Sequence, residues 1–118
     1  MTDSLEKVQF YQIASTLWNE CWGDTELFIN DVRGKEIARQ LIRSVGSISA
    51  NTEEGYGRGF GKEYPHFLRI ARGSTRESKG WYKRSKFLLS ENVIEGRIEK
   101  LDAIIAMVTK SIKTLEQK

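Results

Sequence analysis

The sequence is poor in the residues from which most metal sites, disulfide frameworks and nucleophilic active sites are built. It contains one cysteine, Cys21, and one histidine, His66. A single cysteine excludes an internal disulfide framework and is typical of a protein in a reducing compartment. Because no second histidine or cysteine accompanies His66 at ligand spacing, we expect no metal, no cofactor and no catalytic residues, and therefore no enzyme.

Long apolar runs and prolines are equally scarce. No stretch approaches the roughly 20 apolar residues that are needed to cross a membrane. The first residues also lack the basic and hydrophobic regions of a signal peptide. The sequence therefore predicts a cytoplasmic protein without membrane contact. The only proline, Pro65, falls where a helix is expected to begin, and its missing N–H costs little there.

Apolar residues recur every three or four positions in four segments. This spacing predicts helices over residues 4–22, 32–54, 62–89 and 91–116, joined by short connections. A chain of 118 residues suits one domain. We therefore predict a single domain over residues 1–118, an all-α, up-down-up-down antiparallel four-helix bundle. Its core is expected to include Leu41, Ile48, Phe67, Leu101 and Ile105.

Glycines mark where these helices should end or touch. Gly23-Asp24 is predicted to end the first helix, and residues 27–29 are expected to fold back on the end of the bundle. Gly55 and Gly57 suit a helix end followed by a tight reversal, so residues 55–61 are predicted to form a turn. Glycines inside the second helix, at 34 and 46, predict the close approach of another helix.

Two stretches carry a family resemblance. The residues that carry it are Ser47-Ile48, Asn51, Glu54-Gly55, Gly57-Arg58, Phe67-Leu68, Ile70-Ala71, Gly73-Ser74 and Glu77. In this order they resemble the signature of the rRNA intervening-sequence proteins, over about residues 8–112. These are small bacterial four-helix bundle proteins, some of them encoded inside insertions of large-subunit ribosomal RNA genes. The pattern departs at Thr52-Glu53, where the family usually has a hydrophobic residue and alanine.

The resemblance implies a closed helical bundle and a ring-shaped homo-oligomer, a homopentamer. It implies no known reaction.

The charges of the chain are segregated along the sequence. Residues 1–32 carry a net charge of −5, residues 33–86 a net charge of +8, and residues 87–118 none. Such an asymmetry indicates an anionic partner, or an acidic segment of a neighbouring subunit.

The strongest functional signal is a basic face on the predicted helix 62–89. Cations recur there every three or four residues, and further arginines precede the helix. Such a face predicts salt-sensitive, largely sequence-independent RNA binding. Tyr56 and Phe60 are expected to stack on unpaired bases. The predicted nucleic-acid-binding residues are Arg39, Arg43, Arg58, Lys62, Arg69, Arg72, Arg76, Lys79 and Lys83.

Two other interpretations of this basic face stay open. It can be an ordinary solvated helix face. It can also dock on the acidic first helix of a neighbouring subunit, through Glu20 and Asp24, in a structural or adaptor module.

A second set of residues is predicted to be structural or to lie at an interface: Ser47, Asn51, Glu54, Gly55, Ser74 and Glu77. Ser47 and Asn51 are expected to bond across a helix or subunit contact. Because an unpaired, partly buried carboxylate is costly, Glu54 is expected to pair with Arg72 or Arg76. The sequence thus predicts a non-enzymatic, homo-oligomeric, RNA-binding helical bundle.

Overall fold

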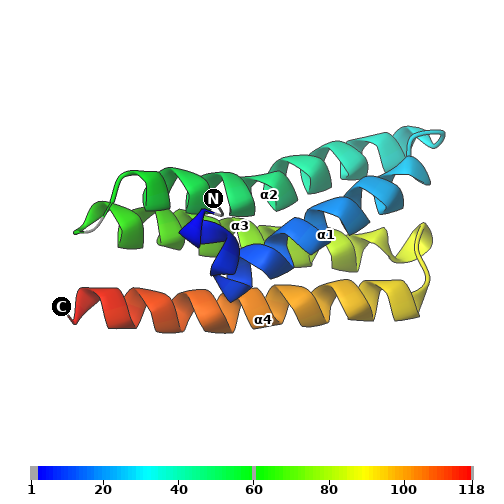
Figure 1. Ribbon diagram of the computed structural model, residues 1–118. Coiled ribbons are helices and arrows are strands. Elements are labelled where there is room, and N and C mark those ends of the chain that lie inside the picture. The colour runs from blue at the N-terminus through cyan, green and yellow to red at the C-terminus, as the bar shows by residue number, and fades with distance from the viewer. Residues whose placement is uncertain (1–2, 60, 118) are drawn as a thin grey trace.

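Four long helices run antiparallel to one another and make up most of the molecule (Figure 1). The computed structural model describes residues 3–59 and 61–117. The long helices are α1 (Gln9–Glu26), α2 (Val32–Gly57), α3 (Glu63–Arg84) and α4 (Glu91–Glu116), and the short 3₁₀ helices are η1 (Ser4–Lys7) and η2 (Ser85–Phe87). The predicted all-α, up-down-up-down bundle is confirmed. No helix within the described ranges combines the length and the apolar character that a membrane span requires.

The four helices are arranged so that α1 and α3 each contact both α2 and α4. The α1–α2 edge and the α3–α4 edge therefore lie on opposite sides of the bundle. Figure 1 shows that the α1–α2 and α3–α4 connections share one end of the molecule, while the α2–α3 turn and the C-terminus lie at the other. We call the shared end, formed by residues 27–31 and 85–90, the two-loop end.

The core is formed by one apolar stripe from each long helix. Leu41, Ile48 and Leu101 are fully buried, as predicted. The prediction for Ile105 is wrong, because this residue is only half-buried and Ile104 is buried in its place. A helix turns once in 3.6 residues, so the buried stripe of α4 can advance from Leu101 by either three or four residues. The packing of α4 selects the step of three, and only one of the two adjacent isoleucines faces inward.

The α2–α3 contact is unusually close near the α2–α3 turn. A Cβ atom added at Gly55 would lie 2.6 Å from the Cβ atom of Phe67 and 3.2 Å from Cδ1 of Tyr64. Gly55 therefore lies inside a helix, where the absence of a side chain admits α3, and the predicted helix end at this residue is wrong. The prediction that Phe67 belongs to the core is wrong. The residue is half-buried: its Cβ packs on Gly55, and its ring lies under the exposed Arg58, whose Cζ is 5.2 Å from the ring centroid.

The chain reverses between α2 and α3 at two later glycines. Gly59 and Gly61 have positive φ angles of 87° and 107°, a region that favours glycine. Thr52, where the sequence departs from the family pattern, is buried and its hydroxyl donates to the Ile48 carbonyl at 2.8 Å. The helix thus accommodates this polar residue in its last turns.

The first helix is longer than predicted and passes through Gly23-Asp24 to Glu26. Its last turn is held by the Thr25 hydroxyl, which donates to the Cys21 carbonyl at 2.9 Å. In the connection that follows, only Phe28 folds into the core. Leu27 and Ile29 are 67% and 50% exposed, so the expectation that all three residues fold back is wrong for these two.

The glycines inside α2 have different neighbours. Gly46 lies against the Trp18 ring of α1, since an added Cβ would be 3.0 Å from Cζ3 of that ring. At Gly34 the close neighbour is the backbone carbonyl of Phe28, which belongs to a connection and not to a helix. The third helix is also shorter than predicted, because it ends at Arg84 and passes into η2.

Candidate functional site

The residues that carry the family resemblance gather along the contact between α2 and α3. The Ser74 hydroxyl of α3 donates to the Ser47 hydroxyl of α2 at 2.9 Å. Asn51 stays within its own helix, where Nδ2 donates to the carbonyl and hydroxyl oxygens of Ser47 at 2.9 and 2.8 Å. The seam between the helices is therefore lined by small polar groups that satisfy one another.

An ion pair extends this seam toward the two-loop end. Arg43 of α2 forms an ion pair with Glu77 of α3, and the same carboxylate accepts a hydrogen bond from Nε1 of Trp81 at 3.2 Å. Arg43 also donates to the side-chain oxygen of Gln40 at 3.2 and 3.1 Å. The Arg43 side chain nevertheless remains 57% exposed. This cation thus bridges two helices and is still accessible to solvent.

The predicted partner of Glu54 is wrong. Its carboxylate accepts from Arg58 at 3.2 Å, one turn further along the chain, and Arg58 also approaches Glu63 to 3.7 Å. This pairing arises because α2 continues beyond Gly55. Arg72 points toward α4, where Nη1 donates to the Thr109 hydroxyl at 3.1 Å.

The basic face predicted on α3 divides into two parts. One part is engaged with α4: Lys79 pairs with Asp102 at 2.7 Å and Arg69 pairs with Glu116. The other part points to solvent and repeats every seven residues. We call it the outer cation row, and it consists of Lys62, Arg69, Arg76 and Lys83, all of which are exposed.

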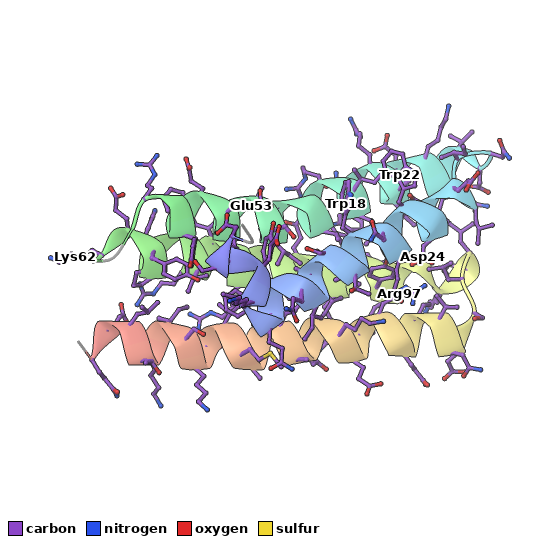
Figure 2. The ribbon with its side chains drawn as sticks, in the orientation of Figure 1. Trp18, Trp22, Asp24, Glu53, Lys62 and Arg97 are labelled. Atoms are coloured by element: carbon purple, nitrogen blue, oxygen red, sulfur yellow. The ribbon has the colours of Figure 1, made fainter. Side chains whose placement is uncertain are left out.

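The row runs along most of α3. Lys62, at its start, projects at the end of the molecule opposite the two-loop end (Figure 2). Arg69 belongs to both parts, since its side chain is 44% exposed despite the pair with Glu116. On α2, Arg39 is 72% exposed and pairs with Glu36 at 2.8 Å.

Two acidic residues of α1, Glu20 and Asp24, are bound within the same chain. Arg97 of α4 donates to both carboxylate oxygens of Asp24, from Nε at 2.8 Å and from Nη2 at 3.0 Å, and to Glu20 from Nη1 at 2.9 Å. Asp24 also accepts from the Tyr82 hydroxyl at 2.8 Å, and Lys100 donates to Glu20 at 2.8 Å. Figure 2 shows Asp24 and Arg97 next to each other between α1 and α4.

This network corrects the expectation that Glu20 and Asp24 receive the basic face of a neighbouring subunit. Both carboxylates already have cationic partners, and Asp24 is only 7% exposed. Arg97 is the residue that sequence analysis missed. The signal that would have found it is a lone arginine near the buried stripe of a helix, opposite an acidic helix.

Comparison with known families confirms the family resemblance that the residues along α2 and α3 carry. The sequence model of the 23S rRNA-intervening sequence protein matches residues 6–110. The chain belongs to this family. No curated protein matches the chain.

In this member of the 23S rRNA-intervening sequence family, the thiol of Cys21 is buried and unreactive. Burial raises the pKa of Cys21 to about 11, so the thiol stays protonated near neutral pH. Burial also raises the pKa of Tyr82, whose hydroxyl is bound to Asp24. Within the described residues, His, Cys, Asp and Glu nowhere gather in groups of three or more that would hold a metal.

Of the two aromatic residues that were expected to stack on bases, Tyr56 and Phe60, the structure describes only Tyr56. Tyr56 is half-buried, packs edge-to-face on Tyr64 with 5.6 Å between ring centroids, and bonds through its hydroxyl to Ser4. Most of its ring is therefore occupied by the protein. Phe60 lies outside the described residues.

Large apolar side chains are exposed at the two-loop end of this family member. They are Trp22, Leu27, Ile29, Val32 and Phe87, with exposed fractions from 50% to 86%. Beside them, between α1 and α2, is a hollow of about 310 Å³ lined by Trp22, Thr25, Glu26, Ile29 and Ile42. Figure 2 shows Trp22 next to Trp18 on the side of α1 that faces α2.

Proposed function

We propose that this 23S rRNA-intervening sequence family member is a non-enzymatic, homo-oligomeric cytoplasmic protein that binds RNA through α3. The outer cation row carries the proposal. Four exposed cations repeat every seven residues, so consecutive charges lie about 10 Å apart along the helix axis. A row of one sign with this length suits several phosphates of one RNA strand or groove edge.

The charge of the row is largely uncompensated. Within the described residues, Lys62, Arg76 and Lys83 form no ion pair. The pair between Arg69 and Glu116 is exposed, and exposed pairs typically contribute only about 0–1 kcal/mol. A phosphate can therefore displace this carboxylate at small cost. Two arginines in the row also offer the planar donor geometry that suits phosphate.

The backbone beside the row is open. A Cβ atom added at Gly73, which lies on the outer side of α3, would meet nothing within 4 Å. An RNA backbone can therefore approach the helix closely between the cations of the row.

The non-enzymatic part of the proposal rests on the state of the most chemically capable groups. Glu20 and Asp24 are held in ion pairs with Arg97 and Lys100. The Cys21 thiol is buried and its raised pKa keeps it protonated. These groups support the fold and are poorly placed to act on a substrate.

RNA binding is tested by reversing Lys62 and Arg76, two cations of the row that form no ion pair within the described residues and lie farther from the two-loop end than Lys83. We expect the double variant Lys62→Glu with Arg76→Glu to weaken binding to all RNA sequences alike. The slope of log K against log salt should flatten by about one for each lost phosphate contact. Fluorescence anisotropy with single-stranded and hairpin RNA at two salt concentrations measures both effects.

The matched control is Lys110→Glu with Lys113→Glu, which changes the net charge equally at exposed positions on α4. If both double variants lose the same affinity, net charge rather than the row governs binding. If neither loses affinity, the proposed role of α3 is wrong.

The homo-oligomer is supported by a separate observation. Two apolar surfaces of the kind that marks protein contacts are exposed toward the two-loop end, one at Trp22 and Ile29 and the other at Phe87. The family resemblance adds the number of subunits, five. Light scattering should therefore give a mass near five times the 13.6 kDa subunit. A mass of one subunit at micromolar concentration would exclude self-assembly and, with it, an adaptor built by self-assembly.

A further inference from the structure

We propose that the Phe87 corner of one copy docks into the Trp22–Ile29–Ile42 hollow of the next copy. This inference rests on the proposed self-assembly and names the two surfaces that form its interface. The Phe87 side chain is 86% exposed, although covering a phenylalanine removes some 150–250 Å² from water. Such an exposed aromatic residue is a typical anchor of a protein interface.

The hollow offers a matching site. It has a volume of about 310 Å³ and is walled by Trp22, Ile29 and Ile42, with Glu26 also lining it. The Trp22 ring, which is 63% exposed, is supported from behind by Trp18, with 6.1 Å between the ring centroids. An aromatic wall therefore exists before any partner arrives, and a preformed wall lowers the cost of ordering the surface on docking.

The charges of the two surfaces are complementary. Lys86 lies over the Phe87 ring, with Nζ 5.2 Å from the ring centroid, so the corner carries a positive charge. Glu26 of the hollow forms no ion pair within the described residues, unlike Glu20 and Asp24 on the same helix. A neighbouring Lys86 would give Glu26 a partner at the rim of the docked ring.

The positions of the two surfaces suit a ring. The hollow lies on the α1–α2 edge and Phe87 follows α3, on the opposite edge, yet both lie toward the two-loop end (Figure 1). Two different surfaces on opposite sides form a heterologous contact, and such a contact builds a ring when the rotation from one copy to the next closes on itself. A two-fold dimer would instead need one surface that fits itself.

The first test removes each surface separately. Phe87→Ala and Ile29→Asp change exposed side chains, so far-UV circular dichroism should stay unchanged. Each variant should weaken assembly by about thirtyfold or more, as expected when an anchor residue is lost. Ile70→Ala, an exposed apolar residue on α3, is the matched control and should assemble as the wild type does.

Mixing the two variants tests whether the contact is heterologous. The intact Phe87 of the Ile29→Asp variant can enter the intact hollow of the Phe87→Ala variant. We expect a 1:1 heterodimer that cannot grow, seen by light scattering, whereas either variant alone is monomeric. A mixture that stays monomeric would overturn this pairing of surfaces.

Charge reversal tests the rim. Glu26→Lys and Lys86→Glu should each weaken assembly, because each change places two like charges across the interface. The double variant should recover assembly, because a lysine at 26 then faces a glutamate at 86 of the next copy. A wild-type oligomer that persists in Phe87→Ala would overturn the inference and leave the proposed self-assembly standing. A wild-type monomer would overturn both.

Discussion

Replacing Arg97 with methionine should destabilise the bundle strongly, because it breaks a largely buried ion pair. The guanidinium donates two hydrogen bonds to Asp24 and one to Glu20, and its side chain is only 17% exposed. Methionine keeps much of the volume but leaves the Asp24 carboxylate, 9% exposed, without a cation. Removing one partner of a buried pair costs about 3–5 kcal/mol.

The expected loss follows from the partners that remain. After the substitution, Asp24 keeps the hydrogen bond from the Tyr82 hydroxyl, and Glu20 keeps Lys100. Glu20 therefore stays compensated, and most of the loss falls on Asp24. Urea unfolding followed by circular dichroism should show a midpoint lowered accordingly. At about 4 °C per kcal/mol for a chain of this size, the thermal midpoint should fall by roughly 12–20 °C.

A double-mutant cycle separates the ion pair from simple packing. Asp24→Asn with Arg97→Met removes the buried charge together with its partner, so it should be more stable than Arg97→Met alone. The coupling free energy should be about 0.5–3 kcal/mol, the usual range for residues in one network. Arg97→Met within 1 kcal/mol of the wild type, or a double variant whose losses simply add, would refute the reasoning.

The remaining predictions concern the α2–α3 contact and the buried titratable groups. Gly55→Ala should destabilise the protein by about 1–3 kcal/mol, because the added Cβ would meet Phe67. Gly96→Ala should stabilise it by up to about 1 kcal/mol in the same urea titration, because the space around Gly96 is open. Burial raises the pKa of Tyr82 above its value of about 10 in the unfolded chain, so the contribution of Tyr82 to the free energy of unfolding is fully present below about pH 10 and is lost as the pH rises above that value. Urea unfolding at pH 9 and at pH 11 should show this loss of stability. The loss should be smaller in the Tyr82→Phe variant. Cys21 should resist an aromatic disulfide reagent at pH 8 until urea unfolds the chain, and fast labelling of the native protein would contradict its burial.

The helical fold could be predicted because each helix repeats its apolar residues over several turns. Such a signal depends on many positions, so errors at single residues do not destroy it. The apolar spacing does not always identify the single residue that is buried. Ile104 and Ile105 both satisfy the spacing, and only the packing of α4 decides that Ile104 is the buried one. Helix ends were harder to predict, since Gly55 is explained by a contact with α3 rather than by its own chain conformation.

The partners of charged residues could not be read from the sequence. Arg97 and Asp24 are separated by 73 positions, and their contact depends on how α1 and α4 are rotated toward each other. Glu54 illustrates the local version of this problem, because its pairing with Arg58 depends on α2 continuing for one more turn. The spacing of residues in the sequence predicts which face of a helix a charged side chain occupies. Which of several opposite charges it pairs with depends on how the helices pack.

The internal ion pairs decide which charges are left for a partner. Glu20 and Asp24 of α1 pair with Arg97 and Lys100 of α4, so these two carboxylates do not neutralise α3. Two carboxylates of α4, Asp102 and Glu116, pair with Lys79 and Arg69 of α3. The net charge of +8 over residues 33–86 is therefore concentrated on the outside of α2 and α3. Because a surface of net positive charge attracts the opposite charge over about 8–10 Å at physiological salt, this side of the bundle suits the polyanion of the proposed function. The apolar two-loop end lies apart from most of the cation row, so the proposed assembly and the proposed RNA binding would use different surfaces of the bundle.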